Sequence, residues 1–89
     1  MMFLEIIKAE YLTDYKLWLE FNDGTIMSVD LENELRGIVF EPLRNKELFK
    51  NFSVKYNTIE WENGADFAPE YLFSIGQPLT RTSYPGSTR

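Results

Sequence analysis

The sequence predicts an α+β domain: an antiparallel three-stranded meander plus a second short hairpin, with two short helices packed on the sheet. Residues 16–21 and 25–31 alternate apolar and polar side chains with period two, which is typical of half-buried strands. Residues 43–52 and 69–75 begin at or just after a proline and carry apolar residues at helical spacing. A chain of 89 residues holds one core. We expect a single domain at residues 1–79 and a flexible tail at 80–89.

The register of the meander follows from its apolar faces. Leu19 must lie opposite Met27 to bring both apolar sets to one face, and this leaves a three-residue loop. The loop ends in Gly24, for which we expect a positive φ. The first hairpin should unite the same face, with a turn centred on residues 13–15 and Lys8 opposite Glu20. Its expected apolar pairs are Ile7 with Phe21, Ala9 with Leu19, and Tyr11 with Leu17.

Turn and cap residues divide the rest of the chain. We expect a short helical turn at residues 31–37, capped by Asp30 and ended by Gly37 in a left-handed conformation. A continuous helix should follow over residues 43–52, and the last helix, at 69–75, should stop at Gly76.

A second hairpin is predicted between these two helices. Its strands, residues 53–56 and 58–61, should join at a two-residue turn of Asn57 and Thr58. That turn would pair Tyr56 with Ile59 and Val54 with Trp61.

Composition excludes several kinds of chemistry. The chain has no Cys and no His, which excludes disulfides, thiolate nucleophiles, zinc fingers and every Ser-His or Cys-His arrangement. The N-terminus has no basic stretch and carries Glu5 and Glu10, so it matches neither a signal peptide nor a membrane span. We expect a cytoplasmic protein without membrane association.

The charge is strongly acidic, with a net charge of −5 and an isoelectric point near 4.6. Such a field repels phosphate backbones, so direct nucleic-acid binding is disfavoured. Solubility alone accounts for this charge, and it also suits a basic protein partner.

Three segments between residues 9 and 72 stand out as motifs: LWLEFNDG followed by VDL, then FEPL with a downstream Phe, and TIEWENGAD followed by a Pro and a Leu. Together they resemble a small bacterial and archaeal family known as domain of unknown function 2442. The resemblance implies an α+β fold and no established activity. Some relatives carry a helix-turn-helix extension, for which we expect no room after Leu79. Some are encoded beside another small family and are suspected antitoxins.

The residues of these motifs suit structural roles better than functional ones. Asn63 and Gly64 supply positive φ at a turn, Trp61 fills core, and Asp66 is expected to accept backbone N–H groups where the last helix begins. The motif residues that we single out on this basis are Asp23, Gly24, Asp30, Trp61, Asn63, Gly64, Asp66 and Pro69.

Metal binding and catalysis both lack a matching pattern. Carboxylates at residues 60, 62, 66 and 70 could bind Ca²⁺ or Mg²⁺, but their spacing matches no known loop, and a solvated face is the preferred interpretation. Serines and threonines are present without a His to act as base. We therefore predict no metal site, no cofactor and no enzyme.

One face of the meander is unexpectedly apolar. A sheet with a free face should alternate apolar and polar residues, yet large apolar side chains return on the outer face. We interpret this face, with a nearby tyrosine, as a contact with a protein partner or a second copy; its residues are Leu4, Ile6, Tyr15, Trp18 and Ile26. Coverage by the chain's own N-terminal residues or helices is the alternative.

These observations favour a non-enzymatic protein-interaction module, with an antitoxin-like role as one form of it. The alternative is a small-ligand-binding or regulatory domain, with the ligand held between sheet and helices. An enzyme ranks third.

Overall fold

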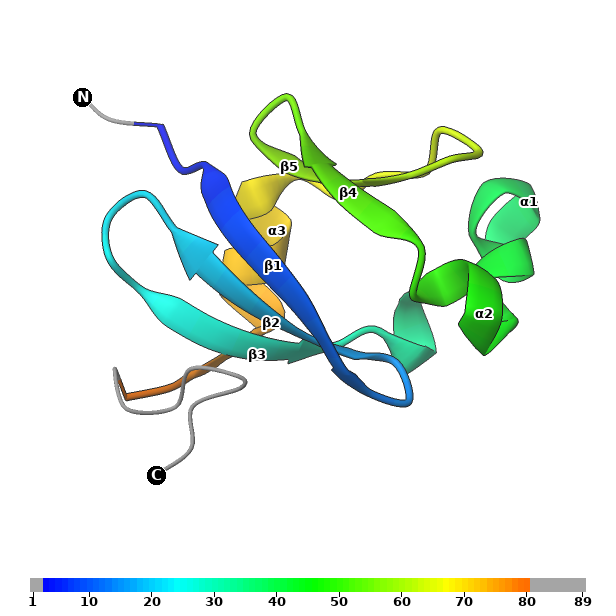
Figure 1. Ribbon diagram of the computed structural model, residues 1–89, viewed down its shortest axis with the longest axis horizontal. Helices are drawn as coiled ribbons and strands as arrows, with labels where there is room; N and C mark the ends of the chain where they lie inside the picture. Colours follow the sequence, from blue (N-terminus) through cyan, green and yellow to red (C-terminus); the bar gives the residue numbers. More distant parts are fainter. Residues whose placement is uncertain (1–2, 81–89) are drawn as a thin grey trace.

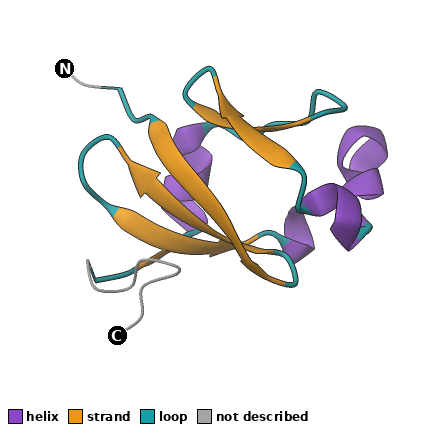
Figure 2. Cartoon of the chain, viewed as in Figure 1, coloured by secondary structure: helices purple, strands orange, loops and turns teal. Residues whose placement is uncertain are grey.

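The computed structural model describes residues 3–80, which form a four-stranded antiparallel sheet, a separate two-stranded hairpin and several short helices (Figure 1). Figure 2 shows three strands first, then the short helices, then the second hairpin and the last helix, and the predicted α+β class is confirmed. Of the tail predicted at 80–89, residues 81–89 lie outside the described residues. In chain order the elements are β1 (Ile6–Thr13), β2 (Lys16–Phe21), β3 (Ile26–Asp30), η1 (Glu32–Glu34), α1 (Gly37–Phe40), η2 (Glu41–Arg44), α2 (Lys46–Phe49), β4 (Phe52–Lys55), β5 (Thr58–Trp61), α3 (Pro69–Ile75) and β6 (Gln77–Pro78).

The predicted register of β2 against β3 is confirmed. Leu19 lies opposite Met27, and Gly24 has a φ of 91°. The Phe21 N–H donates to the Thr25 carbonyl at 2.9 Å and closes a three-residue loop. Period-two alternation was sufficient here, because a shift of one residue would have turned every buried side chain of β3 to the other face.

The first hairpin has the predicted pairs only in its middle. Tyr11 lies opposite Leu17 and Lys8 opposite Glu20, but Ile6, rather than Ile7, pairs with Phe21. A bulge at this end of β1 therefore reverses the alternation. Ile6 is only 2% exposed and belongs to the main core, so its predicted place on the outer face is wrong.

Hydrogen bonds from distant residues hold this shifted end of β1. The Asn22 side chain accepts from the Glu5 N–H and donates to the Phe3 carbonyl. The Ile6 N–H donates to the Asn57 carbonyl in the turn of the β4–β5 hairpin. At the other end of β1, a further irregularity pairs Thr13 with Lys16 and narrows the predicted turn to two residues.

The continuous helix predicted over residues 43–52 is wrong. Asn45 has an extended backbone, with a ψ of 115°, and its side chain accepts from the Glu47 N–H at the start of α2. An Asn favours this arrangement because its oxygen satisfies an N–H group that has no partner inside the helix. The segment is therefore two short helices, η2 and α2. The structure adds α1, which begins at Gly37 with a φ of 87°.

The register predicted for the β4–β5 hairpin is also wrong. Val54 lies opposite Ile59, and Phe52 opposite Trp61. The turn consists of Tyr56 and Asn57, with φ values of 51° and 76°. Two left-handed residues match the twist of the flanking strands. Thr58, being β-branched, is poorly suited to a positive φ and belongs to β5 instead.

The last helix and a fourth strand complete the core. α3 has the predicted bounds and lies behind the sheet in Figure 1. Its Leu72 is fully buried, and its Phe73 meets the Phe21 ring edge-on at 5.2 Å. β6 was not predicted. It pairs with β3, and the Leu79 N–H donates to the Ile26 carbonyl at 2.9 Å. The core therefore lies between the sheet, α3 and the β4–β5 hairpin.

Candidate interaction surface

The apolar residues predicted to contact a partner do not form an exposed patch within the single chain. Trp18 is 1% exposed and Ile26 is 2% exposed, and both lie outside the main core cluster. Leu4 is half-buried and packs against that cluster, to which Ile6 itself belongs. Contact between this face and a partner stays a prediction.

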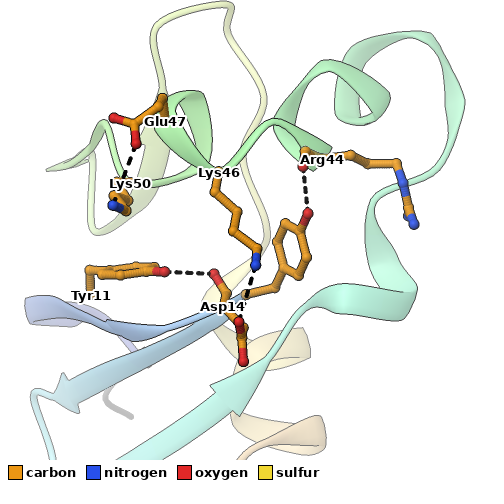
Figure 3. A network of polar contacts seen from close by, with 7 residues as sticks. Tyr11, Asp14, Arg44, Lys46, Glu47 and Lys50 are labelled. Carbon is orange, nitrogen blue, oxygen red and sulfur yellow. Dashed lines mark hydrogen bonds and ion pairs between the residues drawn. The ribbon is translucent and has the colours of Figure 1, made fainter.

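Tyr15 has a defined structural task. Its hydroxyl donates to the Arg44 carbonyl, and its ring meets Phe49 edge-on at 5.3 Å. Lys46 lies 5.6 Å from the ring centre and forms a salt bridge with Asp14 at 3.1 Å. Figure 3 shows the salt bridge of Lys46 with Asp14, which links the β1–β2 turn to α2. Tyr15 thus fixes η2 and α2 against the sheet.

Two of the family-motif segments form the same turn. In FNDGT and WENGA, the fourth residue has a φ near 90° and its N–H donates to the first carbonyl. In each, the N–H of the fifth residue donates to the third side chain, which is Asp23 in one turn and Asn63 in the other. The structural role expected for these residues follows from this geometry.

The remaining motif residues differ in outcome. Asp30 accepts from the Glu32 N–H at 3.0 Å, as expected of a cap, and Pro69 occupies the first turn of α3. Asp66 does not cap α3, because that helix begins after Ala68 without a side-chain hydrogen bond, so the prediction for Asp66 is wrong. Trp61 is 2% exposed, and its indole N–H donates to the Phe49 carbonyl at 2.8 Å.

Trp61 lines two neighbouring hollows of the surface. The apolar hollow has a volume of about 190 Å³ and lies between the helical segment 37–49 and the end of β5. Its walls are Pro42, Leu43, Leu48, Asn51, Trp61, Glu62 and Asn63. The polar hollow has a volume of about 270 Å³ and lies against the β4–β5 hairpin; its walls are Asn51, Phe52, Ser53, Lys55, Glu60, Trp61 and Glu62. Asn51, Trp61 and Glu62 belong to both.

Exposed apolar side chains lie in the same helical segment. Ile38 is 94% exposed on α1, Val39 is 47% exposed beside it, and Leu48 on α2 is 48% exposed. The Asn63 amide donates to the Val39 carbonyl at 2.8 Å and ties α1 to the turn after β5. Sequence reasoning missed this surface, although apolar residues directly after the Gly37 stop were a usable signal.

Comparison with known proteins gives a family and no activity. The family described as "Protein of unknown function (DUF2442)" matches residues 6–77. The chain belongs to this family. No curated protein and no solved structure matches it. The match includes both hollows of this DUF2442 domain as well as the two related turns.

The displaced pKa values of Asp23, Lys46 and Tyr71 in the DUF2442 domain each have a local cause. The Thr25 N–H donates to Asp23 and lowers the pKa of that carboxyl below its ordinary 3.8. A hydrogen bond to Asp14 raises the pKa of Lys46, and one to Glu34 raises the pKa of Tyr71. None of these three side chains lines either hollow.

Residues 3–80 contain neither a metal-binding cluster nor a membrane-spanning helix. This part of the DUF2442 domain contains no cluster of three or more acidic side chains placed to hold a metal ion. Its longest helix has seven residues, and no helix there is long and apolar enough to cross a bilayer.

Proposed function

We propose that this DUF2442 domain is a non-enzymatic, cytoplasmic protein-interaction module whose contact surface is the apolar side of the helical segment 37–49. The observation that carries the proposal is the exposure of Ile38, Val39 and Leu48 in one helical segment, whose Leu48 also lines an apolar hollow. Isolated exposed apolar residues are ordinary, but a group beside a hollow is typical of a binding surface. An antitoxin-like role is one form of this function, with a toxin as partner.

The charge of the domain supports a protein partner over a nucleic acid. Residues 3–80 carry fourteen Asp and Glu side chains and seven Lys and Arg side chains. The two salt bridges within that range occupy Lys46 and Lys50. An acidic surface repels phosphates and attracts a basic protein.

A small-ligand function, the alternative, fits the hollows less well. Ligand pockets usually have volumes of about 300–1,000 Å³ and enclose most of the ligand. Each hollow, at about 190 Å³ and about 270 Å³, is smaller than this and opens on the surface. The size of the apolar hollow suits one side chain of a partner.

The proposal is tested by a matched pair of variants. Ile38→Gln removes an apolar side chain that is 94% exposed, and Phe3→Gln removes one that is 73% exposed on the N-terminal segment. Association is measured by analytical ultracentrifugation, for the chain alone and with the co-expressed product of the neighbouring gene. We expect the Ile38 variant to weaken the complex several-fold and the Phe3 variant to leave it unchanged. Equal effects of the two variants, or no complex at all, would contradict the proposal.

A further inference from the structure

We propose, building on the interaction role above, that the joined hollows bind a basic peptide segment of the partner in which an Arg or Lys is next to a bulky apolar residue. The apolar side chain occupies the apolar hollow, and the cation lies in the polar hollow between Glu60 and Glu62. The hollows share a wall, so neighbouring residues of one extended segment can reach both.

The apolar hollow has the lining that a hydrophobic anchor requires. Leu43 and Trp61 form its buried base, with 3% and 2% exposure, while Pro42 and the half-exposed Leu48 form its sides. Binding energy at protein interfaces is concentrated where a large side chain enters such a depression and loses its contact with water. Glu62 is the one charged residue of this lining.

The polar hollow supplies the opposite charge for a cation. Glu60 is half-buried, Glu62 is exposed, and both are absent from the salt bridges within residues 3–80. Lys55 is the one basic residue in the lining of this hollow. The cations of α2 are already engaged, because Lys46 binds Asp14 and Lys50 binds Glu47. A guanidinium is well suited here, since it can donate to two carboxylates at once.

The walls of both hollows are held in place before any partner binds. Asn63 donates to the Val39 carbonyl at 2.8 Å, and the Trp61 indole donates to the Phe49 carbonyl at 2.8 Å. The Trp61 ring also lies 5.7 Å from the Phe49 ring. A surface that is already ordered loses little conformational freedom on binding, which favours a short segment as ligand.

The experiment is a titration of ¹⁵N-labelled protein with three synthetic peptides that are blocked at both ends. GKRWKG carries both features, GKRAKG lacks the bulky side chain, and GEEWEG lacks the positive charge. The chain has two tryptophans, so its two indole N–H signals provide separate readouts for Trp61 at the hollows and for Trp18 on β2, which lines neither hollow.

We expect GKRWKG to shift the Trp61 indole signal and the amides of Leu48 and Glu62 in a saturable way. Loss of a bulky apolar contact corresponds to a weakening of roughly tenfold or more, so GKRAKG should bind at least that much more weakly. GEEWEG should not bind, and added salt should weaken the binding of GKRWKG.

Matched variants separate the two halves of the site. Leu48→Gln and Glu62→Gln should each weaken binding of GKRWKG several-fold. Leu12→Gln, at a residue with 39% exposure on β1, and Glu32→Gln, at an exposed residue on η1, should leave binding unchanged. Shifts centred on Trp18, equal binding of GKRWKG and GKRAKG, or equal effects of all four variants would overturn the proposal.

The outcomes also distinguish this inference from the proposed function. A protein complex that depends on Ile38 while none of the peptides binds at the hollows overturns the peptide site alone. A second copy as occupant would appear as shifts that grow with protein concentration in the absence of peptide, and would likewise overturn it. Peptide binding as described, without any protein complex, would support the site and contradict the proposed function.

Discussion

At the scale of single residues, Trp61 connects the parts of the core. Its ring lies 5.7 Å from Phe49 on α2, 6.3 Å from Phe52 on β4 and 6.0 Å from Phe67 before α3. Its indole N–H satisfies the Phe49 carbonyl at the end of α2. One side chain thus contacts aromatic rings from three separate segments.

Removal of this ring should be among the most costly changes in the chain. Trp61→Ala should lower the free energy of unfolding by about 3–5 kcal/mol, typical of a truncated buried ring. Trp61→Phe keeps most of the volume but leaves the Phe49 carbonyl without its donor, at a cost of about 1–3 kcal/mol. Urea denaturation measures both values. A Trp61→Ala protein as stable as wild type would show that the ring is not part of the core.

Trp18 provides the test of the outer sheet face. With 1% exposure it should act as a buried residue, so Trp18→Ala should cost about 3–5 kcal/mol in urea denaturation, irrespective of protein concentration. If Trp18→Ala instead kept its stability and lost self-association or partner binding, the predicted contact on this face would be supported.

At the scale of elements, the two related turns depend on glycine. Gly24 and Gly64 have φ values of 91° and 90°, and an added Cβ would meet no atom within 4 Å at either position. The expected cost of Gly24→Val therefore comes mainly from backbone strain, about 1–2 kcal/mol. Gly24→Asn should cost less, since Asn tolerates positive φ. Thermal unfolding of the two variants checks this order, and equal stability would contradict it.

Asp23 and Asn63, the residues before these glycines, differ in charge, so replacing each by the other residue type should affect stability differently. The depressed pKa of Asp23 means that its charged form stabilises the fold above pH 3.8, and this contribution disappears as pH falls through the lowered value. Asp23→Asn should therefore reduce the loss of stability in acid. Asn63→Asp should destabilise at neutral pH, because a carboxylate cannot donate to the Val39 carbonyl. Urea denaturation from pH 2 to pH 7 tests both, and parallel curves would contradict them.

The predictable elements were those with a local cause. The Leu19–Met27 register follows from alternation alone, and the bounds of α3 follow from Pro69 and Gly76. The bulge near Ile6 depends on bonds to Asn22 and Asn57, residues far along the chain, so no local pattern reveals it.

The candidate site was predicted even less well than the fold. Trp61 was expected in the core, but the hollows on its two sides are formed by three separate segments. The helical backbone breaks at Asn45, and Leu48 on α2 is half-exposed. The sequence pattern was interpreted as one continuous helix over residues 43–52, and that interpretation did not reveal this exposure.

At the scale of the whole molecule, the excess of acidic side chains should make stability depend on salt. Like charges repel one another in the folded state, and ions at 0.15 M screen this repulsion beyond about 8 Å. The melting temperature at pH 7 should therefore rise as NaCl increases from about 10 mM to 150 mM. Near pH 4.6, close to the isoelectric point, the same change should have little effect. A melting temperature that falls with salt at pH 7 would contradict this account.

The pairing of β6 with β3 affects how the chain folds during synthesis. The pairs β1–β2, β2–β3 and β4–β5 join neighbours in sequence, so their loops close within microseconds. The edge of β3 receives its partner only after residues 77–79 have left the ribosome, when the other elements of residues 3–80 have already been made. Until then the Ile26 carbonyl lies on an open strand edge, where another nascent chain could pair with it. Mutual repulsion between acidic chains would slow such encounters during this interval.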